Sequence, residues 1–480
     1  AEVTSAGRPP NILVFMTDQQ QAAVTERGHP CRMPNVNRFA EEGVRFVRAH
    51  TPTALCAPAR ASLMTGLYAH RHGMLNNPHV PQSIRRDLVE PFPMWSDRLK
   101  DAGYRMHYCG KWGVTEGVNG PDNHGWEIPD RETAHKLWTP WPGRDAALKG
   151  AHELRRPGYK PYLLYGEVTD GPEAFPELRW TRYAAARLKE LAAGPEPWCL
   201  FLALHGPHDP YLAPSAHLRL YDPATVPQPV NFDDSLADKP AVYRRQRHEL
   251  WGSMEWEDYA GATAAYWAYN SFIDDLFGEL LAALDATGQA RDTLVLYLSD
   301  HGEMMGAHGL FFKGVTAFEE CYRIPLIARW PAGIEAGKIC GEFASLLDVG
   351  PTLLEAAGAP SLPEAHGRSF LPLLRGVLPA DWPQEFFGQF FGSELLYTQR
   401  ILVTKTHKYV FNGFDFDELY DLVADPGETR NLYFSPEHEP LLHEMVARMW
   451  RRAFLAGDLV TCHGYPTTDL VPLGPYRIEQ

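Results

Sequence analysis

The chain has 480 residues, of which 45% are hydrophobic, and a formal net charge of −15 at pH 7. This length supports a large buried core, and the acidic balance gives little attraction to nucleic acid or an anionic membrane surface, so neither is an expected partner. Because no apolar run approaches the roughly 20 residues of a membrane helix and residues 1–10 lack a hydrophobic signal core, we expect a cytoplasmic chain, or a periplasmic or secreted one whose signal has been removed.

Buried strands and helices alternate along residues 11–330. The apolar run at 11–17 predicts a strand covered on both faces. Further elements are predicted as helices at 34–42, 94–102 and 260–286, and as strands at 44–49, 104–109, 198–204, 293–299 and 324–330. This order predicts an α/β sandwich with a large mixed, mostly parallel central sheet, whose ligands gather at the strand ends. We interpret the irregular stretch 126–197, rich in Pro, Gly and Trp, as long insertions near the site entrance.

After residue 375 the pattern of predicted elements changes to short strands followed by a helix. The predicted elements there are three short strands, a turn and a helix, at 400–404, 408–411, 418–422, 425–427 and 437–454. They predict a smaller antiparallel subdomain with a covering helix. We therefore divide the chain into an α/β domain, residues 1–375, and a C-terminal antiparallel subdomain with its tail, residues 376–480.

The seven cysteines are scattered and include no Cys-x-x-Cys pair. This spacing argues against a disulfide framework and a cysteine-rich zinc site, so most are expected to be buried thiols. Cys56 differs, because Pro58 suits the first turn of a helix and Gly66 suits its end. Backbone N–H groups there favour an anion, and Arg60 can add a donor fork for a tetrahedral oxyanion. On these residues alone, the alternative to a nucleophile that faces an anion is a buried, unreactive Cys56 with Arg60 in a surface ion pair.

The pattern Cys-x-Pro-x-Arg followed by Thr65-Gly66 resembles the signature of the formylglycine-dependent (type I) sulfatases of the alkaline phosphatase superfamily. The resemblance implies that a formylglycine-generating enzyme oxidises Cys56 to formylglycine during maturation. In that family the aldehyde hydrates to a diol, and one of its oxygens attacks the sulfur of a sulfate ester. The second hydroxyl then expels sulfate by C–O cleavage. An alkaline-phosphatase-like fold is also implied, with residues 408–410, 418–422 and 425–428 resembling its terminal subdomain.

Two pairs of residues at predicted strand ends resemble the metal-binding motifs of the same family. The pairs are Asp18 with Gln19 and Asp300 with His301. Each pair alone is also compatible with an ordinary loop, but their order around Cys56 favours one divalent metal per chain. Such a metal would lower the pKa of the diol and draw charge from a sulfate oxygen. Calcium is the first expectation, with manganese or zinc as alternatives.

Three further residues match the family's sulfate-binding and acid groups. Lys111 and Lys313 resemble its two lysines, which would stabilise the charge that grows on the sulfuryl oxygens. His208, in a Pro-His-x-Pro motif, matches the histidine expected to protonate the leaving alcohol oxygen. His205 is left outside the catalytic set, as a neighbour or a structural loop residue. The predicted catalytic residues are therefore Cys56, Arg60, Lys111, His208 and Lys313.

The sequence departs from the commonest sulfatase pattern at three positions. Gly113 stands where many members have a histidine, and His107, about 13 Å from Lys111 along a strand, is unsuited to replace it. Gln19 replaces an aspartate and His301 an asparagine, which makes the site less selective for calcium and more open to manganese or zinc. These metal-site pairs resemble the branch of choline sulfatases and phosphonate monoester hydrolases.

Three functions compete on this evidence. The first is hydrolysis of a sulfate monoester of a small molecule or carbohydrate, and the second is hydrolysis of a phosphonate monoester or phosphodiester at the same site. The core residues do not separate these two, because both groups are tetrahedral anions. The third, an inactive anion-binding protein, predicts an unmodified Cys56, and the intact residue set argues against it.

The alcohol part of the substrate is not specified by these motifs, because pocket walls come from variable loops. An aromatic platform for a cation or sugar could come from Trp138, Trp141 and Trp180. Tryptophans of this kind more often belong to the hydrophobic core, which is the first expectation for these three. A homo-oligomer is compatible with the sequence.

Overall fold

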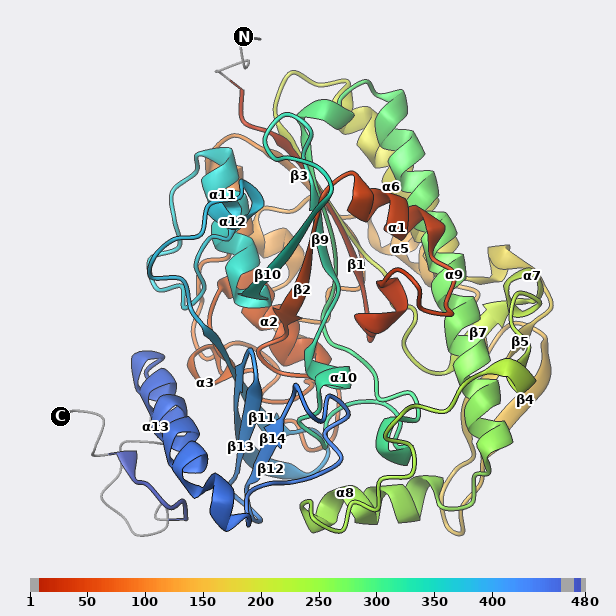
Figure 1. The fold of residues 1–480 in the computed structure, drawn as a ribbon. Coiled ribbons are helices and arrows are strands. Elements are labelled where there is room, and N and C mark those ends of the chain that lie inside the picture. The colour runs from red at the N-terminus through yellow and green to blue at the C-terminus, as the bar shows by residue number, and fades with distance from the viewer. Residues whose placement is uncertain (1–7, 459–469, 476–480) are drawn as a thin grey trace.

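The computed structural model describes residues 8–458 and 470–475. At its centre lies a large twisted sheet (Figure 1). It has seven strands in the order β10-β2-β9-β8-β1-β6-β3. Its strands are β1 Asn11–Thr17, β2 Val44–His50, β3 Arg105–Gly110, β6 Trp198–Ala203, β8 Thr293–Ser299, β9 Leu326–Arg329 and β10 Lys338–Ser345. β9 is antiparallel to β2 and β8, and the other neighbouring pairs are parallel. The predicted mixed, mostly parallel sheet is confirmed.

Helices cover both faces of this sheet (Figure 1). One layer holds α1 Pro34–Glu41, α6 Pro176–Ala192 and α9 Trp256–Ala286, and the other holds α2 Cys56–Thr65, α4 Trp95–Asp101 and α11 Val349–Ala357. Further helices are α3 Ala69–His72, α5 Arg131–Trp138, α7 Ser215–Leu218, α8 Ala241–Gln246, α10 Glu319–Tyr322 and α12 Leu371–Leu374. In β1, Phe15 packs in the first layer and Val14 in the second, so the whole strand is buried. A continuous apolar run is thus required at this position.

The stretch expected to be irregular contains regular elements. It includes α6, which packs against α9, and the strands β4 (Leu148–Leu154) and β5 (Tyr162–Val168). These strands form a separate three-stranded sheet with β7 (Tyr211–Pro214). The sequence pattern missed β4 because only Leu154 at its end is buried, so no apolar alternation marks the strand.

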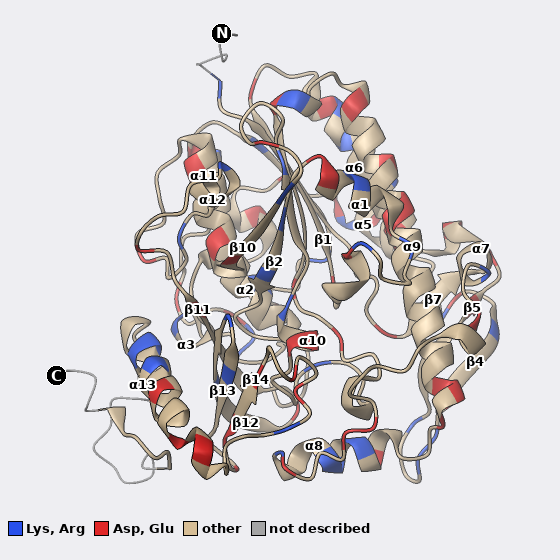
Figure 2. Ribbon diagram, in the orientation of Figure 1, with Lys and Arg blue, Asp and Glu red and all other residues tan. Residues whose placement is uncertain are grey.

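A four-stranded antiparallel sheet follows toward the C-terminus, in the order β11-β12-β13-β14. Its strands are β11 Glu385–Gly392, β12 Leu396–Thr404, β13 His407–Asn412 and β14 Glu418–Asp421. Helix α13 (Glu439–Leu455) packs on this sheet and carries charges of both signs (Figure 2). Its Arg448 lies 2.5 Å from Glu385 of β11. The predicted antiparallel sheet is confirmed, while the domain boundary at residue 375 stays a prediction.

Lys408 of β13 connects the C-terminal sheet to helix α10. Its buried ammonium group lies 2.8 Å from Glu319 and 2.6 Å from Glu428. Helix α10 begins at Glu319 and in turn supports the loop after β8, because the backbone N–H of Gly302 donates to the carbonyl of Cys321 at 2.8 Å. The C-terminal sheet therefore helps to hold the loop that follows β8.

Six of the seven cysteines lie in the described residues, and all six are free thiols. Five of them are buried, as expected, and Cys340 is partly exposed. Cys462 and most of the predicted C-terminal tail lie outside the described residues. Among the described helices, none has both the length and the apolar character needed to cross a lipid bilayer.

Candidate active site

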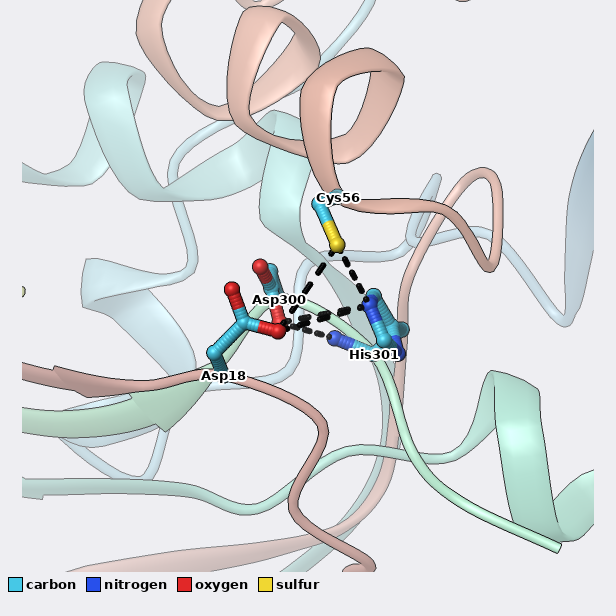
Figure 3. A group of neighbouring side chains, drawn as sticks. All are labelled: Asp18, Cys56, Asp300 and His301. Atoms are coloured by element: carbon cyan, nitrogen blue, oxygen red, sulfur yellow. Dashed lines mark hydrogen bonds and ion pairs between the residues drawn. The ribbon is translucent and has the colours of Figure 1, made fainter. Parts of the chain in front are cut away.

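Four side chains meet where β1 and β8 end and α2 begins (Figure 3). Asp18 follows β1, Asp300 and His301 follow β8, and Cys56 is the first residue of α2. One potential ligand atom from each residue lies within 4.8 Å of the others, and each residue is at most 4% exposed. β1 and β8 are adjacent parallel strands in register to their last residues, which brings the two distant carboxylates together.

Arg60, one turn into α2, is bound by both carboxylates of this four-residue cluster. Its Nε donates to Oδ2 of Asp300 at 2.8 Å, and its Nη2 donates to Oδ2 of Asp18 at 2.9 Å. The other oxygen of each carboxylate, Oδ1, lies 3.8 Å from Nε2 of His301. Two of the Arg60 donors are thus used by the carboxylates and orient them toward the cluster, while its role toward an oxyanion stays a prediction.

The cluster attracts positive charge. Burial and the nearby Asp18 raise the pKa of Asp300. Burial would also raise the pKa of Asp18, but Lys111 and Arg60 outweigh it and hold that pKa well below its usual range. Burial disfavours a charged His301, yet Asp300 and Cys56 raise the pKa of the histidine to about 9.

His301 also directs one ring nitrogen, Nε2, toward the cluster. Its Nδ1 lies 2.9 Å from the carbonyl oxygen of Gly302, and its Nε2 lies 3.3 Å from Sγ of Cys56. The carbonyl oxygen can only accept, so Nδ1 donates to it and Nε2 keeps a lone pair in the neutral ring. Two carboxylate oxygens and this nitrogen form a donor set that suits a divalent cation.

The two predicted lysines and His208 lie around the cluster. Lys111 lies 2.5 Å from Oδ2 of Asp18, and Nζ of Lys313 lies 2.8 Å from Nε2 of His208. Burial and Asp18 raise the pKa of the Cys56 thiol, but Lys111, Lys313 and His301 outweigh them and bring it well below its usual value. Both ammonium groups therefore act electrostatically on position 56.

Gln19 does not direct its side chain to the cluster. Its backbone has φ +64, its amide oxygen accepts from Lys313, and its Nε2 donates to Asp209 at 2.8 Å and to Glu303 at 2.5 Å. Only the backbone N–H of Gln19 contacts a cluster carboxylate, Asp300, at 3.1 Å. Its assignment as a metal ligand stays a prediction, and both amide atoms have partners elsewhere in this structure.

Asp209 and Tyr162 also belong to the site, although the sequence did not single them out. The buried carboxylate of Asp209 lies 3.3 Å from Nδ1 of His208 and accepts from the hydroxyl of Tyr162. Burial opposes ionisation of Asp209, but His208 and Lys313 lower its pKa to about 2. Burial likewise disfavours a charged His208, but Asp209 raises the pKa of the histidine. Adjacency to His208 was a usable signal for Asp209, whereas Tyr162 lies on β5, which the pattern missed.

The structure shows the surroundings of Gly113 and His107, two positions that bear on the departure from the common motif. Gly113 has φ +61, and a Cβ there would lie 3.2 Å from both Arg60 and Lys111. A side chain at this position would therefore be strained and crowded. His107 packs instead against Tyr183, with ring centres 5.8 Å apart, and approaches Glu127 at 3.9 Å.

His205 lies beside His208, and Trp141 lies on His205. The ring centre of His205 is 4.7 Å from that of His208 and 4.9 Å from that of Trp141. Burial lowers the pKa of His205 well below its usual value, which favours a neutral ring. Trp180 is buried in the core, as expected, whereas Trp138 and Trp141 are only partly buried. An aromatic wall thus borders the side of the site where His208 lies.

Known proteins resemble the chain over most of its length. Residues 10–359 match the family described as Sulfatase, and residues 306–453 match that described as N-sulphoglucosamine sulphohydrolase, C-terminal. An uncharacterized sulfatase of Escherichia coli is 32% identical over 441 residues, covering 88% of this chain and 83% of the relative. Choline-sulfatase of Rhizobium meliloti is 31% identical over 458 residues, covering 89% and 83%. The structure of a phosphonate monoester hydrolase from Silicibacter pomeroyi has a TM-score of 0.77 at 25% identity, covering 95% of this chain and 97% of the other.

Proposed function

Because the chain belongs to the sulfatase family of the alkaline phosphatase superfamily, whose members are hydrolases, we propose that it cleaves a sulfate monoester with formylglycine at position 56 and one divalent metal. The position of Cys56 carries this proposal: it begins α2 and lies with Asp18, Asp300 and His301 in one buried cluster. A formylglycine-generating enzyme would modify Cys56 during maturation. The C-terminal match to N-sulphoglucosamine sulphohydrolase supports a sulfated carbohydrate as substrate, and the likeness to choline-sulfatase supports a sulfated small molecule.

Asp18, Asp300 and His301 would hold the metal together with an oxygen of the modified residue 56. Oxygen ligands suit calcium, and the imidazole nitrogen opens the site to manganese or zinc. The hydrogen bond from Nδ1 of His301 to Gly302 would keep Nε2 available for coordination. A metal bound there supplies Lewis-acid stabilisation of the charge that forms during hydrolysis.

The remaining site residues would orient the carboxylates, stabilise negative charge on the substrate and protonate the leaving group. Arg60 keeps the two carboxylates in place, and Lys111 and Lys313 would stabilise negative charge on the sulfuryl oxygens. His208 would donate a proton to the leaving alcohol oxygen, with Asp209 favouring its protonated form. Trp141, which packs on His205 next to His208, would then contact the alcohol part of the ester.

Replacing one cluster carboxylate is expected to remove metal and activity together. In Asp300→Asn the cation loses one of two negative ligands, so we expect metal content below one per chain and a loss in kcat/KM of about 10–100-fold or more. Elemental analysis and steady-state kinetics on the same preparation measure both. Asp274→Asn is a matched control, because Asp274 is equally buried but bonds to Asn35 of α1. Full activity of the natural protein after exhaustive chelation would rule the metal site out.

Hydrolysis of a phosphonate monoester or phosphodiester is the second candidate, and the likeness to the Silicibacter pomeroyi enzyme favours it. The two candidates share the cluster, so the deciding measurement is kcat/KM for an aryl sulfate against an aryl phenylphosphonate, each divided by the formylglycine content. We expect the sulfate to be the better substrate. A higher value for the phosphonate would transfer the assignment to the second candidate.

A further inference from the structure

Glu177 is a buried acidic residue that the proposed chemistry leaves unexplained. It is the second residue of α6 and is 1% exposed. Its Oε1 accepts a hydrogen bond from the backbone N–H of Gly206 at 3.0 Å, and the hydroxyl of Tyr269 is its neighbouring polar side-chain group. Burying a carboxyl group without a salt bridge costs folding free energy, so its presence here needs a reason.

Gly206 connects Glu177 to the site. Its carbonyl oxygen accepts from the backbone N–H of Asp18 at 3.2 Å, while its own N–H donates to Glu177. A Cβ on Gly206 would lie 2.6 Å from the ring of Tyr269, so the backbone is tightly confined at this point. His208 follows two residues later. The hydrogen bonds through Gly206 therefore fix the turn that carries His208 relative to the end of β1.

We propose that Glu177 is a positioning residue for His208. It holds the backbone of the turn from the α6 side, while Asp209 and Lys313 make polar contacts with the His208 ring. This inference rests on the proposed function, in which His208 protonates the leaving oxygen. Proton transfer requires the donor within about 3 Å of that oxygen, and a displacement of about 1 Å can cost roughly 100-fold in rate.

Three variants test this role. Glu177→Met keeps a similar volume but removes the acceptor, Glu177→Gln keeps an amide oxygen for Gly206, and Thr181→Val serves as a matched control. Thr181 is equally buried one turn later on α6, and its hydroxyl bonds to the carbonyl oxygen of Glu177 within the helix. We expect the methionine variant to lose about 10–100-fold in kcat/KM on an alkyl or sugar sulfate and much less on nitrophenyl sulfate. The other two variants should stay near the natural rates.

A double-mutant cycle with His208→Ala decides the matter. If Glu177 acts through His208, adding Glu177→Met to His208→Ala changes kcat/KM no further, because the turn then has no ring to position. The proposal would be overturned if the losses of the two single variants add in the double variant. It would also be overturned if Glu177→Met loses equal activity on both substrates while the loss of His208→Ala depends on the substrate. Circular dichroism checks folding, and Glu177→Leu replaces the methionine variant if that one does not fold. A natural protein without sulfatase activity would contradict the proposed function instead.

Discussion

Cys56→Ser is expected to lose nearly all turnover, on the order of 10⁴-fold or more in kcat, while the protein stays folded. A serine offers one hydroxyl, which can accept the sulfuryl group but leaves no second hydroxyl on the same carbon to expel sulfate. Water would then have to attack an anionic sulfate ester directly, so the variant should accumulate as a sulfated serine. The side chain is small and buried at the start of α2, so the exchange of sulfur for oxygen disturbs little packing.

Mass spectrometry of the peptide that contains residue 56 provides the measurement. The natural protein should show formylglycine in the same fraction of molecules as is active, and the serine variant should show a sulfate adduct after incubation with substrate. Cys340→Ser is the control, because Cys340 lies on β10 and is partly exposed, and this variant should retain activity. A serine variant that turns over at the natural rate would contradict the formylglycine mechanism.

The sequence was sufficient for the parts of the fold that bury apolar surface continuously. The strands β1 and β8 are uninterrupted apolar runs covered on both faces, and their parallel pairing places Asp18 beside Asp300. Strand β4 was missed because almost all its residues are at least partly exposed, so its sequence has no alternation of apolar and polar residues. Local patterns thus report which segments are buried, and they miss segments held mainly by backbone hydrogen bonds.

A second limit of sequence-based prediction is the orientation of polar side chains in the site. Motifs gave the identities of Arg60 and Gln19, but they do not encode where a long polar side chain points. The guanidinium of Arg60 is bound by the two carboxylates, and the amide of Gln19 lies among Lys313, Asp209 and Glu303, because buried polar atoms need partners. Glu177 lies far from any motif in sequence, so only the folded chain reveals its bond to Gly206.

His208→Ala is expected to reduce kcat/KM on alkyl or sugar sulfates by roughly 10²–10⁴-fold, the usual range for loss of a general acid. An alkoxide is a poor leaving group and needs a proton in the transition state, whereas nitrophenolate is a stable anion without one. The loss on nitrophenyl sulfate should therefore be much smaller. The structure is compatible with this role, because Asp209 beside Nδ1 of His208 outweighs burial and raises the pKa of the histidine.

A control separates protonation from simple contact. His205 has its ring centre 4.7 Å from that of His208, but burial keeps its pKa low, so His205→Gln should cost both substrates equally. A His208 that only contacts the sulfuryl oxygen would behave in the same way, since that group is common to both esters. Equal losses of kcat/KM on the two ester types in His208→Ala would therefore remove the general-acid role and leave His208 as an electrostatic contact.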